Sequence, residues 1–239
     1  MFSYKDNVRY SDVDKNGKLP LYGVLAYFQN CINQHSFDIG KDYEAMETLG
    51  KVWVLISWKI KVVKEVKAYD KIEVGTWSHG FDRMYGYRNY IMYDEEGNRV
   101  AYADTKWVLI DINTRMPQRP TEEDLEGYVK GEAIDMPECS RRLKLSEDRE
   151  KKEPVKVLKT YIDTNGHMNN TAYFRLADEY IPEEFKYNTV DAVYVKETTE
   201  GMTMVPYVHK EENGVGISFE SEDGIVFTKI KFYNEEEAK

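Results

Sequence analysis

The chain has 239 residues, 41% of them hydrophobic, which is enough for the core of one large domain or two small ones. Its formal net charge of −10 disfavours nucleic acid as a partner, and no apolar run approaches the roughly 20 residues that span a bilayer. With only Cys31 and Cys139 as cysteines, and an N-terminus unlike a signal peptide, we expect free thiols and a cytoplasmic protein.

The first predicted element is a helix that follows a polar loop from Asp12 to Gly17. The helix is indicated by apolar residues at helical spacing, namely Leu21, Val24, Leu25, Phe28 and Ile32. The loop places oxygen ligands where a calcium loop has them. Its twelfth position is Gly23, however, where a bidentate Glu is required, and no helix precedes Asp12. We therefore reject a calcium site.

Four long strands follow in the first half, near 52–62, 72–81, 84–94 and 98–111. In the first of them, apolar side chains keep one parity while Ser57, Lys59 and Lys61 occupy the other. This alternation predicts one buried face and one polar face. The segment from Asp94 to Asn98 predicts a hairpin turn between the last two strands.

Residues 112–154 break the strand pattern, because they combine dense charge with Pro117, Pro120, Pro137 and Pro154. We predict a crossover segment there, with a short helix around 121–130. The second half then repeats the plan of the first. It has a predicted strand near 155–161, a helix near 169–181, and strands near 189–197, 203–210, 214–221 and 225–233.

A short polar motif occurs twice. Asp163-Thr164-Asn165-Gly166-His167 precedes the second predicted helix and matches Asp14-Lys15-Asn16-Gly17-Lys18 at an offset of 149 residues (163 − 14). We interpret the chain as two copies of one ancestral unit. The predicted fold class is α+β, with two long helices each wrapped by an antiparallel sheet. The predicted domains are an N-terminal unit over 1–115, a crossover linker over 116–154 and a C-terminal unit over 155–239.

The second copy gathers candidate catalytic side chains. Asp163, Asn165 and His167 lie just before a helix, where free backbone N–H groups favour negative charge, as a site that stabilises an oxyanion requires. Asp and Asn also precede helices simply as caps and turn formers. The first copy keeps its Asp, Asn and Gly but has Lys18 in place of the histidine, so turn formation does not require His167. No second His or Cys lies at zinc-ligand spacing, and no cofactor motif is present.

The motif Asp-x-Asn-x-His-x-Asn-Asn-x-x-Tyr, which starts at Asp163 and is followed by Glu179, resembles the signature of plant and bacterial acyl-acyl carrier protein thioesterases. The resemblance covers nearly the whole chain through further segments: Asp12 to Gly17, Trp53-Val54-Leu55, Trp107-Val108 with Thr114-Arg115, and Tyr194 to Glu197. It implies a tandem hotdog fold, with the acyl chain held in the N-terminal unit and the catalytic motif in the C-terminal unit. Without a plastid-targeting extension, the chain is similar to bacterial members.

The resemblance implies a catalytic set of Asp163, Asn165, His167 and Glu197, with no metal and no cofactor. Glu197 and His167 would orient and deprotonate a water, while Asn165 would hold the water or the carbonyl. Asp163 would fix the orientation of Asn165 or His167, and direct attack by Asp163 through an anhydride is the alternative. Some plant members have a cysteine directly after the position of Glu197. Thr198 stands there in this chain, so a cysteine nucleophile is unavailable.

The alternation of side chains along the strand gives a second reason to expect a partner for Glu197. It shares a face with Val193 and Val195 on the predicted strand near 189–197, and we expect that face to be buried. An unpaired buried carboxylate would be costly, so we expect His167 or Asn165 to lie beside it.

The expected reaction is hydrolysis of an acyl-acyl carrier protein thioester to free fatty acid, in fatty acid biosynthesis. The expected partner is acyl carrier protein bearing a phosphopantetheine-linked acyl chain, with no nucleic acid and no membrane, and a homodimer is left open. Because carrier proteins are acidic, six arginines are candidates for docking: Arg83, Arg88, Arg115, Arg119, Arg141 and Arg142. The alternatives are an acyl-CoA thioesterase of hotdog fold and a non-catalytic acyl-binding hotdog protein.

Overall fold

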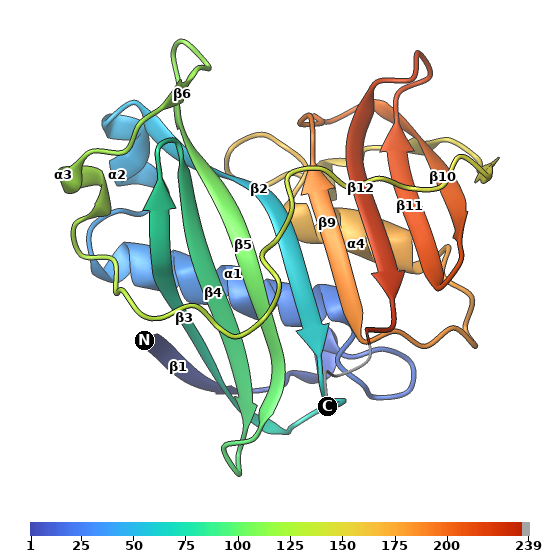
Figure 1. Ribbon diagram of the computed structural model, residues 1–239, viewed down its shortest axis with the longest axis horizontal. Helices are drawn as coiled ribbons and strands as arrows, with labels where there is room; N and C mark the ends of the chain where they lie inside the picture. The colour runs from blue at the N-terminus through green and yellow to red at the C-terminus, as the bar shows by residue number, and fades with distance from the viewer. Residues whose placement is uncertain (236–239) are drawn as a thin grey trace. The chain divides into compact units, whose positions relative to one another are not determined.

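The computed structural model describes residues 1–235 (Figure 1). The chain divides into two compact units. The first comprises Met1–Ile56 and Val62–Cys139, and the second comprises Ser57–Lys61 and the chain from Ser140 onward. Among the described residues, no helix is long and apolar enough to cross a bilayer.

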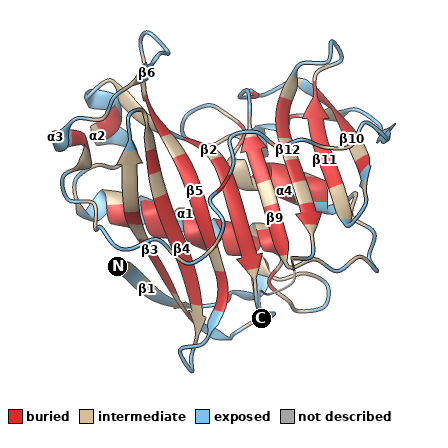
Figure 2. Ribbon diagram, in the orientation of Figure 1, coloured by how far each residue is buried: buried red, intermediate tan, exposed pale blue. Residues whose placement is uncertain are grey.

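The first unit is an antiparallel sheet with α1 (Leu21–Asp38) lying across one face (Figure 1). The strand order is β1 (Phe2–Asn7), β3 (Lys71–Asp82), β4 (Tyr85–Asp94), β5 (Arg99–Asp111) and β2 (Lys51–Val62). The core between helix and sheet includes the large buried side chains of Leu25, Phe28, Tyr90 and Met92. Figure 2 shows buried residues along α1 and along the strands β4 and β5. Shorter elements are a 3-10 helix (Tyr10–Asp12), α2 (Tyr43–Thr48), β6 (Pro117–Gln118) and α3 (Glu122–Leu125).

The second unit repeats this plan around α4 (Asn170–Asp178). From the Ser57–Lys61 part of β2, the strand order is β9 (Thr189–Tyr194), β12 (Val226–Tyr233), β11 (Gly214–Glu220), β10 (Thr203–Glu211) and β7 (Arg149–Lys151). The α+β class is confirmed. α1 has 18 residues and α4 has 9, so only the first helix is long. Pro182 helps to stop the second one early, because the residue before a proline avoids the helical conformation.

Two predicted strands of the second half are shorter than expected. The segment near 155–161 forms only β8 (Val155–Lys156) before a 3-10 helix (Lys159–Tyr161). β9 ends at Tyr194 because the next two N–H groups, of Val195 and Lys196, both donate to the Phe227 carbonyl, at 2.8 and 3.2 Å. Glu197 therefore lies in a loop.

The sequence predicted one buried face on β2, but at the last residues of the strand the polar face is buried as well. Ser57, Lys59 and Lys61 are buried, with at most 6% of each residue exposed. The Lys59 ammonium donates to the Tyr233 hydroxyl at 2.6 Å, and the Lys61 ammonium donates to the Glu235 carbonyl at 2.7 Å. Tyr233 at the end of β12 and Glu235 after it supply polar partners for the lysines. Near the start of β2 the predicted parity fails, because Val54 is exposed and Leu55 is buried.

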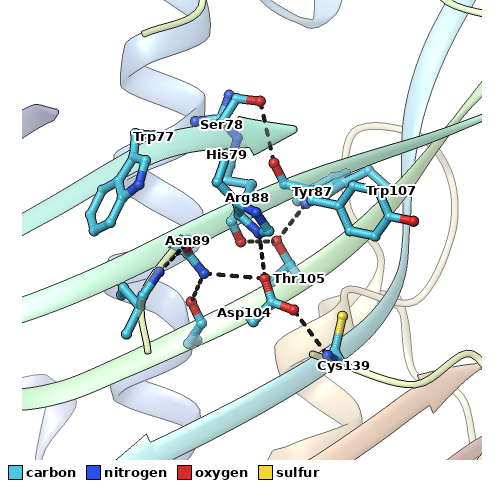
Figure 3. A network of polar contacts seen from close by, with 12 residues as sticks. Trp77, Ser78, His79, Tyr87, Arg88, Asn89, Asp104, Thr105, Trp107 and Cys139 are labelled. Carbon is cyan, nitrogen blue, oxygen red and sulfur yellow. Dashed lines mark hydrogen bonds and ion pairs between the residues drawn. The ribbon is translucent and has the colours of Figure 1, made fainter. Parts of the chain in front are cut away.

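The crossover segment is tied to the units by polar side chains, as Figure 3 shows for the first unit. The buried Asp104 carboxylate accepts hydrogen bonds from the Cys139 N–H at 2.9 Å and the Asn89 amide at 3.1 Å, and His79 Nε2 lies 2.7 Å from it. The Asn89 amide oxygen also accepts the N–H of Ile134 at 2.9 Å. Residues 116–139 thus belong to the first unit, whereas β7 pairs with β10 in the second.

Candidate active site

The loop before α4 is a tight turn organised by one carboxylate. Asp163 Oδ1 accepts the backbone N–H of Asn165 at 2.8 Å and of His167 at 3.4 Å, and the Asp163 N–H donates to the His167 carbonyl at 2.8 Å. Gly166 has a φ of 76°, in the left-handed region where a side chain is strained. The Asp, Asn and Gly of the motif therefore build the turn, and they leave the imidazole of His167 at its end.

The first unit contains the same turn before α1. Asp14 Oδ1 accepts the N–H of Asn16 at 2.8 Å and of Lys18 at 2.9 Å, and Gly17 has a φ of 74°. The two helices begin at Leu21 and Asn170, which are also 149 residues apart. The predicted correspondence of the two helix starts is confirmed.

The start of α4 is capped by Asn169. Its side-chain oxygen accepts the N–H of Thr171 at 2.9 Å, and its carbonyl accepts the N–H of Ala172 at 2.9 Å. Among the described residues, the Asn170 N–H has no protein partner. The first turn of α4 thus offers one backbone donor next to the motif.

His167 and Glu197 form a pair. Glu197 Oε2 lies 3.1 Å from His167 Nε2, and 26% of the histidine side chain and 45% of the glutamate side chain are exposed. The pairing that we expected is present, although the strand-parity argument for it was wrong, because Glu197 lies past the end of β9 and is not on a buried face.

The two remaining predicted residues, Asn165 and Asp163, shape the turn before α4. The Asn165 side chain is exposed, and among the described residues its amide makes no hydrogen bond to His167 or Glu197. The Asp163 carboxylate holds the turn. The catalytic role of these four residues stays a prediction. The structure brings His167 and Glu197 together, and Asp163 holds the turn from which His167 projects.

Sequence analysis missed a second repeat that the structure makes plain. Val63-Lys64-Glu65 recurs as Val195-Lys196-Glu197, and Glu65 Oε1 lies 2.7 Å from Lys18 Nζ. The N–H groups of Val63 and Lys64 share one carbonyl, that of Val100, at 2.8 and 3.2 Å, just as their counterparts share the Phe227 carbonyl. The repeated Val-Lys-Glu sequence could have been used to predict that Glu65 corresponds to Glu197.

Two further predicted features were tested by burial. Cys31 and Cys139 form no disulfide and are buried in the first unit. Burial raises the pKa of the Cys31 thiol to about 12, so Cys31 is not poised as a nucleophile. The prediction that Arg88 is a docking residue was wrong. Its guanidinium is buried, donates to the Thr76 hydroxyl at 3.2 Å and lies 5.1 Å from the centre of the Tyr128 ring.

A small cleft of about 210 Å³ lies at the start of α4, lined by Tyr161, Asn169 and Arg175 among others. His167 and Glu197 do not line it, so the case for a site rests on their pairing. Among the described residues, no three His, Cys, Asp or Glu side chains gather as a metal-ligand set.

Comparisons with known proteins agree on one family. Residues 1–128 match the profile of the acyl-ACP thioesterase N-terminal domain, and residues 144–234 match that of the acyl-ACP thioesterase C-terminal domain. Oleoyl-acyl carrier protein thioesterase 2, chloroplastic, of Arabidopsis thaliana is 27% identical over 207 residues, which are 77% of this chain and 55% of the relative. The corresponding protein of Coriandrum sativum is 24% identical over 204 residues, again 77% and 55%. The chain thus spans about half the length of these relatives.

Solved structures show the same fold. An acyl-ACP thioesterase from Bacteroides thetaiotaomicron superimposes with a TM-score of 0.88 at 23% identity, covering 98% of this chain and 97% of that one. The 12:0-ACP thioesterase from Umbellularia californica gives a TM-score of 0.83 at 16% identity, with coverages of 97% and 96%. The predicted tandem hotdog fold is confirmed.

Proposed function

The chain belongs to the acyl-ACP thioesterase family, and on that premise we propose that it hydrolyses acyl-acyl carrier protein to free fatty acid and carrier protein in fatty acid biosynthesis. The observation that carries the proposal is the contact between His167 and Glu197, 3.1 Å apart beside the start of α4. The first unit has a lysine and a glutamate at the corresponding positions, so the fold itself does not require the imidazole.

The proposed reaction is attack of water on the thioester carbonyl. With a proton on Nε2 donated to Glu197, the neutral His167 ring has its lone pair on Nδ1, which takes the proton of the attacking water. The tetrahedral intermediate then breaks the C–S bond, and the proton passes to the departing thiolate. A thiolate leaves without strong acid assistance, so positioning, a base and an oxyanion donor suffice.

The backbone at the start of α4 completes the proposed machinery. The Asn170 N–H is positioned to receive the oxyanion, while Thr171 and Ala172 are already engaged by the cap. Asp163 holds the turn that carries His167, a role that favours water attack over direct attack by Asp163. The Asn165 amide is exposed and would act on the substrate or its water.

The proposed partner is an acyl carrier protein with its phosphopantetheine-linked chain, and the relatives from Arabidopsis thaliana and Coriandrum sativum are named as thioesterases of oleoyl-acyl carrier protein. A bacterial origin, a cytoplasmic location and a homodimer remain predictions. Gel filtration with light scattering would decide the assembly.

The function is tested by following thiol release from a panel of acyl-ACP and acyl-CoA thioesters of several chain lengths. We expect faster turnover of the carrier-protein thioesters and its loss in His167→Ala. Preference for the CoA thioesters would support an acyl-CoA thioesterase instead. Acyl binding without hydrolysis by the wild-type chain would support a non-catalytic acyl-binding protein.

A further inference from the structure

Glu197 lies in a loop, yet the loop is tied to α4 on both sides of it. Before it, the Tyr194 hydroxyl donates to the Asn170 carbonyl at 3.1 Å. After it, the hydroxyls of Tyr173 and Thr198 lie 2.8 Å apart, and these two residues are 2% and 0% exposed. The loop that carries the carboxylate is thus held by side-chain hydrogen bonds to the helix beside His167.

The first unit ties its counterpart loop to the segment before α1 by a backbone bond, in addition to the Lys18–Glu65 ion pair. The Leu19 N–H donates to the Val66 carbonyl at 2.8 Å, as the Met168 N–H donates to the Thr198 carbonyl at 2.9 Å. This shared bond identifies Val66 as the counterpart of Thr198, each residue directly following the glutamate of its pair.

The side chains at these positions differ in kind. The counterpart of Tyr173 at the helix offset of 149 is Val24, so a valine pair stands where the second unit has a tyrosine and a threonine. Val24 and Val66 are 4% and 6% exposed. The counterpart of Tyr194 is Val62, which has no hydroxyl to offer either.

Stability alone does not account for the two hydroxyls. A buried hydrogen bond adds little net stability, while burying a hydroxyl without a bond is costly. In the first unit the corresponding positions are buried valines, so the counterpart loop forms there without hydroxyls. The hydroxyl pair fixes the position of the loop on the helix more narrowly, because a hydrogen bond requires a particular distance and angle and an apolar contact does not.

The two charge pairs also differ in what they require. Lys18 and Glu65 are 39% and 64% exposed and have long, flexible side chains, so their attraction tolerates small shifts of the loop. A base formed by His167 and Glu197 depends on the orientation of the ring, and a shift of about 1 Å costs up to about 10²-fold in rate.

We propose that Tyr173 and Thr198 are positioning residues that hold Glu197 in register with His167, an inference that rests on the proposed thioesterase function. Thr198 is the residue next to Glu197, so the hydroxyl pair fixes the backbone from which the carboxylate projects. Neither hydroxyl takes part in the reaction itself.

The variants Thr198→Val and Tyr173→Phe test this proposal, because each removes one hydroxyl and leaves the size of the side chain almost unchanged. Each should lower kcat about tenfold or more with little change in KM, and the double variant should be no worse than either single one because both break the same bond. Thr198→Ser, which keeps the hydroxyl, should retain kcat within about threefold. The matched control is Tyr27→Phe, which removes the hydroxyl of a buried tyrosine on α1 that donates to Asp12 at 2.9 Å, and it should leave kcat unchanged.

A crystal structure of Thr198→Val provides a readout that does not depend on activity. We expect the separation of His167 Nε2 and Glu197 Oε2 to exceed hydrogen-bond distance, while α4 and β9 stay in place. Wild-type kcat in both variants, or an unchanged 3.1 Å pair in the crystal, would overturn the positioning role. If the wild-type chain hydrolyses no thioester, the proposed function fails, and the crystal structure still decides whether the hydroxyl pair positions Glu197.

Discussion

At the scale of single residues, the chain provides its own control for the proposed base. Glu197→Gln should keep the fold and lower kcat by roughly 10²-fold or more, because the amide cannot stabilise the imidazolium that forms at His167. Glu65→Gln makes the same change in the first unit, where the partner is Lys18, and should leave kcat unchanged. Steady-state kinetics on one acyl-ACP substrate compares the two. Equal losses would mean that both glutamates serve the fold.

His35 on α1 should make stability sensitive to acid. It is 2% exposed and stacks on Phe2 with ring centres 4.7 Å apart, and burial, followed by the charge of Arg88, lowers the pKa of its imidazole to about 4. In the unfolded chain the pKa is about 6.5, so the unfolded state binds more protons as pH falls from about 6.5 to 4. The free energy of unfolding should therefore decrease over that window, by up to about 3 kcal/mol, and be unaffected by His35 above it.

Urea unfolding of the wild type and His35→Phe at pH 7.5 and pH 5 measures this effect. Phenylalanine keeps the stacking and removes the titrating group, so the variant should lose less stability on acidification. Parallel losses in the two proteins would show that other groups, among them His209 with its lowered pKa, control the acid sensitivity.

At the scale of elements, Asp104 is one of the polar attachments of the crossover segment to the first sheet. Asp104→Ala removes the acceptor of Cys139 N–H and leaves Asn89 and His79 without their shared carboxylate (Figure 3). Leaving a buried hydrogen-bond donor without its acceptor typically costs about 1–3 kcal/mol. Thermal unfolding should show a large decrease in Tm, whereas Asp223→Ala at an exposed turn should show almost none. A small decrease in Asp104→Ala would mean that the segment is held mainly by apolar packing.

The elements also show where sequence reasoning succeeds and where it fails. The starts of α1 and α4 were predictable because the turns before them are local, built by Asp14 and Asp163 within five residues. The burial of Lys59 was not, because its partner Tyr233 is 174 residues away. The parity argument for Glu197 failed for a local reason, since it assumed that β9 continues past Tyr194. The pairing with His167 came from the family resemblance.

At the scale of the whole molecule, charge is distributed unevenly. Residues 1–119 hold 17 Lys and Arg against 16 Asp and Glu, a balance of +1, whereas the rest hold 16 against 27, a balance of −11. An acidic carrier protein is therefore repelled least by the first half and the start of the crossover.

Charge reversal tests this docking hypothesis. Five of the six candidate arginines are exposed, namely Arg83, Arg115, Arg119, Arg141 and Arg142. Replacing two or three of them by Glu should lower kcat/KM for acyl-ACP, mainly at low salt, and leave acyl-CoA turnover nearly unchanged. Similar losses on both substrates would show that these arginines do not act through the carrier protein.

The Lys18–Glu65 pair has a consequence for how such a chain evolves. In a homodimer of identical subunits, every mutation appears in both copies, so no loop can specialise in one copy without changing in the other. Joining two copies in one polypeptide removes that constraint. In this chain one turn has the histidine, with the Tyr173–Thr198 hydroxyl pair next to its glutamate, while the other has an ion pair and valines at the corresponding positions. The proposed reactive centre then serves two folded units, and the first unit is free to evolve toward another task, such as holding the acyl chain, which the family resemblance predicts.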